Sequence, residues 1–241
     1  MKTWVARPLL ISAAILAIAP FAYADAPDRV RKSIGILNEL TSAGDNSIPD
    51  YVLDRAEAVV VIPSFTRGGL LIGAEHGKGI LSVRDRRTNT WSPPTFVEMT
   101  GGTFGPQIGV ESVDLVLLVM NRGAVDQLLR DKFTFGGTAS IAAGPVGRSA
   151  RAGTEPHLES QILGYSRTKG LFAGATLNGT ALKTDESAIE DFYGREMTSR
   201  DIVLGNQLRG AAIPPLANEW RVAIARHTKA SGPVPTTGRH Y

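Results

Sequence analysis

Glycine is concentrated in the middle of this 241-residue chain, where 19 of its 26 glycines lie between residues 65 and 179. Inside a strand each glycine costs roughly 0.5–1 kcal/mol relative to alanine, because its unfolded backbone has more freedom to lose. Such a density is tolerated where the backbone must bend sharply or approach another element closely. We therefore predict a small, strongly curved β-sheet or barrel over this region.

A phosphate-binding loop is the alternative explanation for the glycines, and their spacing disfavours it. Phosphate loops rely on the N-terminus of the helix behind them, whereas the glycines at 101–109 lead into an apolar strand. The segment GAEHGKG at 73–79 has three residues between its first two glycines, where a Walker loop has four. Gly79 also stands where Ser or Thr would ligate magnesium. We expect no nucleotide site.

The chain also lacks the motifs of catalysis and of metal binding. It contains no cysteine and no G-x-S-x-G motif, and its four histidines stand far apart with none in an H-E-x-x-H motif. The sequence does not show which carboxylates the fold brings together, so an unrecognised enzyme stays as the least favoured hypothesis. We expect no enzyme, no cofactor and no metal.

Residues 1–24 have the features of a secretory signal peptide. A positively charged start precedes an apolar run at 9–19, and the tripeptide Ala-Tyr-Ala at 22–24 is a small-x-small cleavage site. The run is about half of the roughly 20 residues that a spanning helix needs, so cleavage after Ala24 is favoured over an uncleaved anchor. We expect a protein that is exported, periplasmic or secreted, and held together without disulfides.

Cleavage would change what the net charge implies. It leaves 24 basic residues against 23 acidic ones, because the first 24 residues hold two of the Lys and Arg and none of the Asp and Glu. So small an excess gives no support to bulk nucleic-acid binding. Any function of the basic residues must come from a local cluster.

The spacing of apolar residues predicts helices at both ends of the chain and strands between them. Helices are expected at 28–42, 51–58, 121–132, 186–193, 199–208 and from Pro214 onwards. Short antiparallel strands with tight connections are expected between them, including 58–63 ending at Pro63, 113–120, 138–143, 161–165 and a hairpin at 169–183 around Asn178-Gly179.

These elements predict an α+β fold: a compact, strongly curved antiparallel β-sheet or barrel-like sandwich with flanking N- and C-terminal helices. We expect one domain at 25–210, followed at 211–241 by a C-terminal helix and a tail whose composition predicts disorder.

Basic residues recur at the predicted turns and beside the apolar stripe of the N-terminal helix. If two or more of these turns meet at one end of the fold, they form an anion-binding patch for phosphates or lipid headgroups; otherwise they are ordinary solvated charges. The N-terminal helix could lie on a membrane or pack its stripe on the sheet. The candidate lipid-binding residues are Arg29, Arg31, Lys32, Arg67, Lys78, Arg84, Arg86, Arg87, Arg148, Arg151, Arg167 and Lys169.

The chain resembles the SYLF-domain family of lipid-binding proteins over roughly residues 30–205. The motifs that carry the resemblance stand in family order and are FTRGG (65–69), GAEHGKG (73–79), WSP (91–93), GGTFGPQIG (101–109) with Asp114, GPVGR (144–148), YSR (165–167), KGLFAG (169–174) and FYG (192–194). The resemblance implies a single compact, β-rich domain without catalysis. It also implies binding of anionic lipids, phosphoinositides above all in eukaryotic members, and actin association in some members.

Two departures from the family bear on function. Lipid contact in eukaryotic members is attributed to a basic, amphipathic N-terminal part, which here keeps only Arg29, Arg31 and Lys32 near its start. Gly164 also stands where Ser is usual before the Tyr-Ser-Arg motif. For an exported protein, an envelope phospholipid such as phosphatidylglycerol or cardiolipin is the more plausible ligand, and actin is an unlikely partner.

The sequence therefore predicts a non-enzymatic module of the cell envelope that binds anionic phospholipid headgroups or a membrane surface, and no nucleic acid. The alternative is a periplasmic protein-interaction or envelope-structural module that docks an envelope protein without binding lipid directly.

Overall fold

The computed structural model describes residues 25–40, 47–130, 132–137, 139–147, 160–168, 171–175, 177, 179–205 and 213–228. The segment 1–24 and the predicted tail from residue 230 lie outside this range. In the part of the chain that is described, no helix combines the length and the apolar character needed to cross a bilayer.

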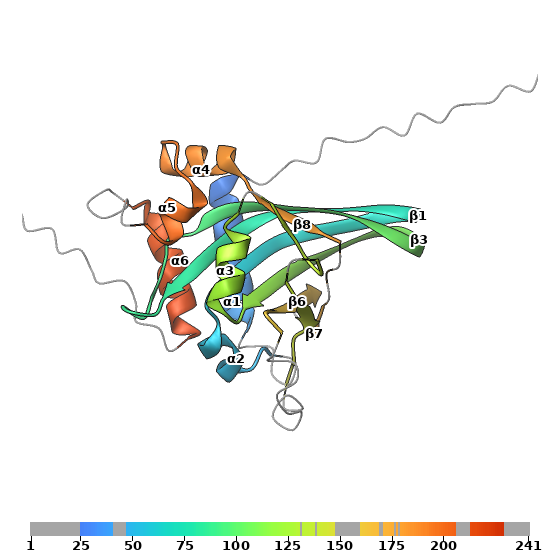
Figure 1. The fold of residues 1–241 in the computed structure, drawn as a ribbon, viewed down its shortest axis with the longest axis horizontal. Coiled ribbons are helices and arrows are strands. Elements are labelled where there is room, and N and C mark those ends of the chain that lie inside the picture. The colour runs from blue at the N-terminus through green and yellow to red at the C-terminus, as the bar shows by residue number, and fades with distance from the viewer. Residues whose placement is uncertain are drawn as a thin grey trace, which may run out of the picture.

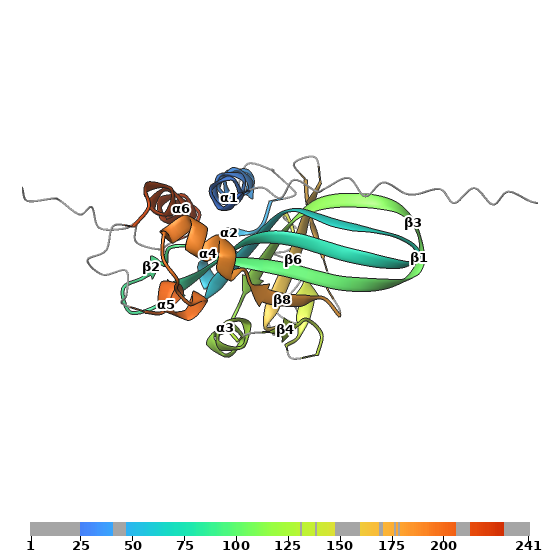
Figure 2. The ribbon, with the colours of Figure 1, turned by 90° about the horizontal axis from the view of Figure 1, so that it is seen from above.

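Two long antiparallel strands, β1 (Ala58–Asp85) and β3 (Thr95–Val119), form a ribbon at the centre of the fold (Figure 1). The ribbon folds back on itself midway, so that the two arms of β1 lie close together (Figure 2). A Cβ atom on Gly79 would lie 2.0 Å from the carbonyl oxygen of Val61 in the other arm. Only glycine fits at so close an approach.

The fold-back occurs between Gly69 and Gly73. A Cβ on Gly69 would lie 2.3 Å from the Cα of Gly73, and the β1–β3 register shifts between Leu70 and Ile72. The glycines thus serve close backbone packing and sharp bending, as predicted. The α+β fold with a strongly curved sheet is confirmed.

The prediction of many short strands was wrong, because β1 and β3 run continuously through their glycines and through Pro63. The pairs Ile62–Leu115 and Phe65–Val113 flank a β-bulge. Two residues of β1, Pro63 and Ser64, lie there opposite a single residue of β3, Asp114. The Asp114 carboxylate accepts the backbone N–H of Ser64 at 2.9 Å. Pro63 has no N–H to pair, and the bulge accommodates it without ending the strand.

The remaining strands extend the ribbon on the β3 side. β6 (Ile162–Thr168) pairs with β3, and β5 (Ile141–Ala143) and β7 (Leu171–Gly174) pair with β6, β5 being parallel. β8 (Ala181–Thr184) pairs with β3 and with β4 (Phe133–Thr134), and β2 (Thr90–Trp91) pairs with the end of β1. The predicted hairpin at 169–183 was wrong, because β7 pairs back onto β6 while β8 pairs with different strands.

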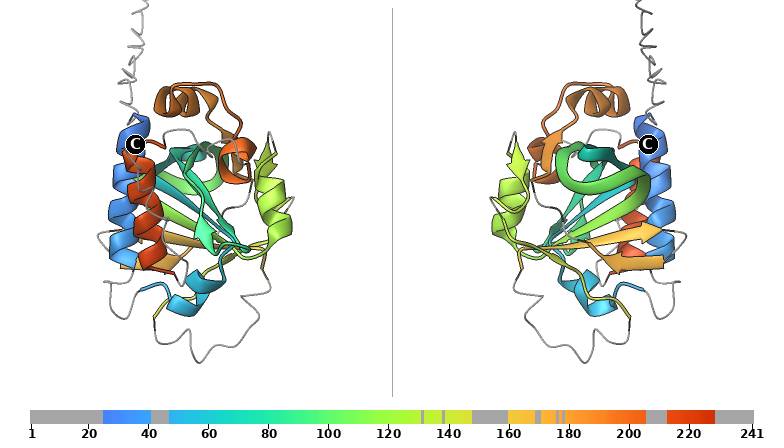
Figure 3. Two further views of the ribbon diagram at one scale, coloured as in Figure 1. Left: turned by 90° about the vertical axis from the view of Figure 1, so that its left-hand side faces the viewer. Right: turned by 90° about the vertical axis from the view of Figure 1, so that its right-hand side faces the viewer.

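Helices flank the sheet as predicted. α1 (Ala26–Leu40) and α6 (Pro215–Arg226) lie side by side, with α3 (Arg122–Leu128) on the opposite side of the molecule (Figure 3). The other helices are α2 (Asp50–Arg55), α4 (Glu186–Tyr193) and α5 (Ser199–Val203). α1 buries Val30 and Leu37 and α6 buries Trp220, so the N-terminal helix packs its apolar stripe into the core.

An ion-pair cluster joins α1 to the ribbon and to α4. The carboxylate of Asp185, at the N-cap of α4, lies 2.7 Å from Arg29 Nη1 and 3.1 Å from Lys78 Nζ. Burial by itself would raise the pKa of Asp185, but bonds from Arg29, Ser187 and Lys78 outweigh burial and lower this pKa to about 2. Arg29 is only 7% exposed, and the Asp185 carboxylate helps to offset the cost of burying its charge.

Gly79→Ala should lower the free energy of unfolding by about 1–3 kcal/mol, because the added methyl group would overlap the Val61 carbonyl oxygen. Urea denaturation followed by circular dichroism measures the change. Gly35→Ala is the matched control, since nothing lies within 4 Å of a Cβ there and alanine favours the α1 helix. An unchanged urea midpoint for Gly79→Ala would contradict the packing of the two arms.

Asp185→Asn should lower the free energy of unfolding at pH 7 by about 3 kcal/mol, because it leaves the buried Arg29 without its anionic partner. The carboxylate's contribution is complete above its unfolded pKa of 3.8 and is lost as the pH falls towards 2, so the variant should also lose stability less steeply than the parent below pH 4.

Urea titrations at several pH values test this, with Asp28→Asn as the control. Asp28 is an exposed acid of α1 that pairs with the exposed Arg31, and its loss should change the free energy of unfolding by less than about 1 kcal/mol. Equal effects of the two substitutions would show that the Asp185 cluster does not hold α1 in place.

Candidate functional site

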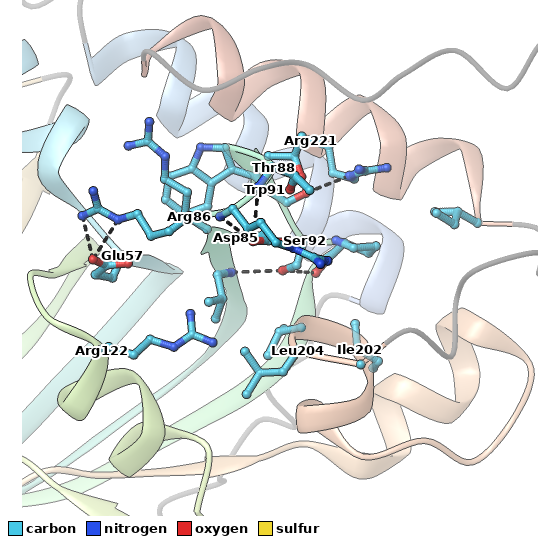
Figure 4. Close-up of a pocket in the computed structure, with 18 residues that line it drawn as sticks. Glu57, Asp85, Arg86, Thr88, Trp91, Ser92, Arg122, Ile202, Leu204 and Arg221 are labelled. Atoms are coloured by element: carbon cyan, nitrogen blue, oxygen red, sulfur yellow. Dashed lines mark hydrogen bonds and ion pairs between the residues drawn. The ribbon is translucent and has the colours of Figure 1, made fainter.

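A pocket of about 830 Å³ lies where β1 leads into β2, between that connection, the residues that follow α5, and helix α6 (Figure 4). Its lining includes two acids, Glu57 and Asp85, and five arginines. The arginines are Arg84, Arg86, Arg87, Arg122 and Arg221. The pocket therefore carries an excess of positive charge, contributed by the β1–β2 connection, α3 and α6.

Two of these arginines hold the walls of the pocket together. Arg84 is buried and donates to the side-chain oxygen of Asn89 and, at 2.6 Å, to the backbone carbonyl of Asp54. Arg221 donates at 2.8 Å to the carbonyl of Trp91. Burial lowers the pKa of both guanidinium groups, but arginine stays charged at neutral pH.

The other three arginines are more accessible. Arg86 pairs with a single carboxylate oxygen of Glu57, Oε1, from Nε at 2.9 Å and Nη2 at 2.6 Å, and this pairing raises the pKa of Arg86. Its side chain is nevertheless 58% exposed. Arg87 and Arg122 are exposed as well. These three side chains are available to a negatively charged group entering the pocket.

One wall of the pocket is apolar. Ile202 and Leu204, at the end of α5, and Ile213, ahead of α6, contribute to the lining. Trp91 also belongs to the lining; it is buried and donates its indole N–H to Thr228 at 3.0 Å. A ligand with both a negative group and a hydrocarbon part would match these two walls.

Of the predicted lipid-binding residues that the structure describes, the pocket is lined only by Arg84, Arg86 and Arg87, which belong to one predicted turn; no other predicted basic turn in the described residues joins them. Arg29 and Lys78 belong to the Asp185 cluster. Arg67 is near Glu75, with Nε 3.8 Å from the carboxylate, and Arg167 bonds to Asp114 and Glu39. Arg31 and Lys32 are exposed on α1. Arg148, Arg151 and Lys169 lie outside the described residues.

Sequence reasoning missed Arg122 and Arg221 because it looked for basic residues at turns. Both lie within predicted helices, Arg122 one position after the N-cap residue Asn121 and Arg221 beside the buried Trp220. Only the tertiary fold brings α3 and α6 towards the β1–β2 connection. Within the described ranges, no three His, Asp or Glu side chains are grouped as metal ligands, and the expectation of no metal or cofactor stays a prediction.

Known proteins resemble this chain over most of its length. The family model Ysc84, described as "Las17-binding protein actin regulator", matches residues 100–224. Protein YSC84 of Saccharomyces cerevisiae is 35% identical over 177 residues, which are 72% of this chain and 36% of that protein. LAS seventeen-binding protein 3 of the same yeast is 33% identical over 175 residues, 71% of this chain and 38% of that protein.

SH3 domain-containing YSC84-like protein 1 of Homo sapiens is 29% identical over 187 residues, 75% of this chain and 54% of that protein. This chain thus spans about a third to a half of the length of the relatives it matches. The matches confirm the resemblance read from the sequence: the chain belongs to the Ysc84 family, the family of the SYLF domain.

Proposed function

We propose that this protein is a non-catalytic binding module that holds the headgroups of anionic phospholipids in the arginine pocket, the pocket lined by Arg84, Arg86, Arg87, Arg122 and Arg221. The observation that carries the proposal is that five arginines, from three separate parts of the chain, line one 830 Å³ pocket. The signal-like features of residues 1–24 support an exported protein that meets this lipid in the cell envelope.

The charges of the pocket favour a phosphate-bearing ligand. A guanidinium group presents its N–H donors as a planar fork that fits two oxygens of one phosphate. Arg84 and Arg221 use donors to hold the walls, so Arg87 and Arg122 are the primary contacts for the ligand. Arg86 adds a further positive charge, which Glu57 partly neutralises.

The apolar wall favours a lipid over a free phosphate. Ile202, Leu204 and Ile213 lie in the same pocket as the arginines, and a glycerophospholipid presents both an anionic phosphodiester and hydrocarbon directly beneath it. A free phosphate would leave this wall without a partner.

A protein-interaction module is the second candidate, and the names of the relatives favour it. The family description and LAS seventeen-binding protein 3 both refer to binding of Las17, and the family description refers to actin regulation. The comparisons therefore give no support to the expectation that actin is an unlikely partner. Because this chain spans only part of those relatives, a partner of this kind is proposed here only as the alternative to lipid.

Arg87→Glu combined with Arg122→Glu should weaken binding to vesicles that contain phosphatidylglycerol. Each basic residue near an anionic surface contributes on the order of 1 kcal/mol, so losing two predicts a decrease in affinity of roughly 30-fold. Co-sedimentation of the chain with vesicles of increasing phosphatidylglycerol content measures the affinity, and binding by the parent should weaken as salt is raised.

Arg31→Glu combined with Lys32→Glu is the matched control, because it reverses two exposed charges of α1 outside the pocket lining. Its effect should be much smaller than that of the pocket variant. Equal losses for the two variants would contradict a specific site. Absence of vesicle binding by the parent, together with capture of Las17-like or actin partners, would favour the second candidate.

A further inference from the structure

The bent end of the β1–β3 ribbon exposes apolar side chains. Only three large hydrophobic residues are strongly exposed in the described part of the chain, and two of them lie here. Ile72, in β1, is 71% exposed, and Val110, in β3, is 79% exposed. The third is Leu171 in β7, which is 56% exposed. Exposed apolar residues are unremarkable when scattered singly, whereas these two stand on either side of one bend.

No charged residue occurs in either strand at this bend. The segments 68–74 and 102–110 consist of glycine, proline, apolar residues, threonine and one glutamine. They include Leu70, Leu71, Phe104 and Ile108 in their sequence. A stretch without charge on both strands is unusual for a solvent-exposed ribbon, since charged residues are the ordinary protection of an exposed strand.

The shape of this end is convex. The ribbon projects beyond the helices and narrows to the fold-back between Gly69 and Gly73 (Figures 1 and 2). β1 and β3 pair on both sides of the bend, from Gly68–Val110 to Leu70–Ile108 and again from Ile72–Phe104, with a register shift between Leu70 and Ile72. The two strands therefore stay side by side up to the bend.

We propose that this bend, residues 68–74 of β1 with 102–110 of β3, is a membrane-contact surface that enters the boundary between the headgroups and the acyl chains of a bilayer. A narrow, convex, charge-free tip fits a deformable bilayer. A protein partner would have to supply a matching apolar cleft and would find no charged side chain to orient it. Entry is limited to the interface, because backbone polar groups without partners are costly in the hydrocarbon interior.

This contact does not depend on anionic lipid. The nearest charged residues along the two strands are Arg67, Glu75, Glu98 and Glu111, which are mostly acidic. The bend also lies at the opposite end of the molecule from the arginine pocket (Figure 1). Ile72 and Arg84 are twelve positions apart in β1, which at about 3.3 Å per residue corresponds to roughly 40 Å along the strand. The inference therefore stands apart from the proposed function.

The test is partition of the purified chain into vesicles of neutral phosphatidylcholine. The parent should bind, and raising the salt concentration should not weaken this binding. Ile72→Asp combined with Val110→Asp should reduce the partition coefficient by roughly tenfold or more, because each change replaces exposed hydrocarbon with charge. Leu171→Asp is the matched control, since it makes the same change at an exposed residue outside the bend, and should leave binding unchanged.

A label at the bend reports insertion directly. The chain has no cysteine, so Val110→Cys and Leu171→Cys each give one site for an environment-sensitive fluorophore. The fluorophore at residue 110 should shift to the blue with vesicles and be quenched by lipids brominated in the acyl chains, whereas that at residue 171 should do neither. Circular dichroism and urea unfolding establish that each variant is folded.

Three results would overturn the inference: no binding to neutral vesicles, a label at residue 110 that stays in water while the chain is bound, or an equal loss for Leu171→Asp. A lipid-free dimer that the double variant converts to monomer would assign the bend to a second copy of this chain. The pocket variant Arg87→Glu with Arg122→Glu should retain neutral binding, so failure of one proposal is distinguishable from failure of the other.

Discussion

The two arms of β1 pack backbone against backbone, and the rest of the fold is arranged around that contact. A Cβ on Gly79 would come within 2.0 Å of the Val61 carbonyl, and one on Gly77 within 2.6 Å of the Ile62 side chain. Without side chains at these positions, a ribbon of 28 and 25 residues can double over within a single domain. The doubling places the β1–β2 connection at one end of the molecule and the bend at the other (Figure 2).

The doubled ribbon also explains why most of the basic residues do not gather at one surface. Helix α1 lies against it and is held at both ends by ion pairs, Arg29 with Asp185 and Glu39 with Arg167. A buried guanidinium group must be paired to offset its desolvation, so these arginines have a structural role that a contact with lipid would disrupt. The remaining excess of positive charge lies where β1 ends, next to α3 and α6.

Sequence reasoning could predict the class of this fold because the glycine density, the apolar spacing and the turn residues are local signals. It could not predict strand length, since a strand that bends at glycines has the same local composition as two strands joined by a turn. The bulge at Pro63 shows the same limit, because its other residue, Ser64, bonds to Asp114, fifty residues further along the chain. Only part of the arginine pocket could be predicted from the sequence. Arg122 and Arg221 have no local signal of function, because only the tertiary fold places them near Arg86 and Arg87.

The positions of the arginine pocket and the bend determine whether one bilayer can contact both sites at the same time. The pocket is concave and carries charge beside an apolar wall, so it suits one lipid headgroup or one segment of a partner. The bend is convex and uncharged, so it suits the interface of a bilayer as a whole. Since the two lie at opposite ends of the molecule (Figure 1), a single flat bilayer that contacts the bend does not reach the pocket. A ligand held in the pocket at the same time must then belong to a second membrane or to a partner protein.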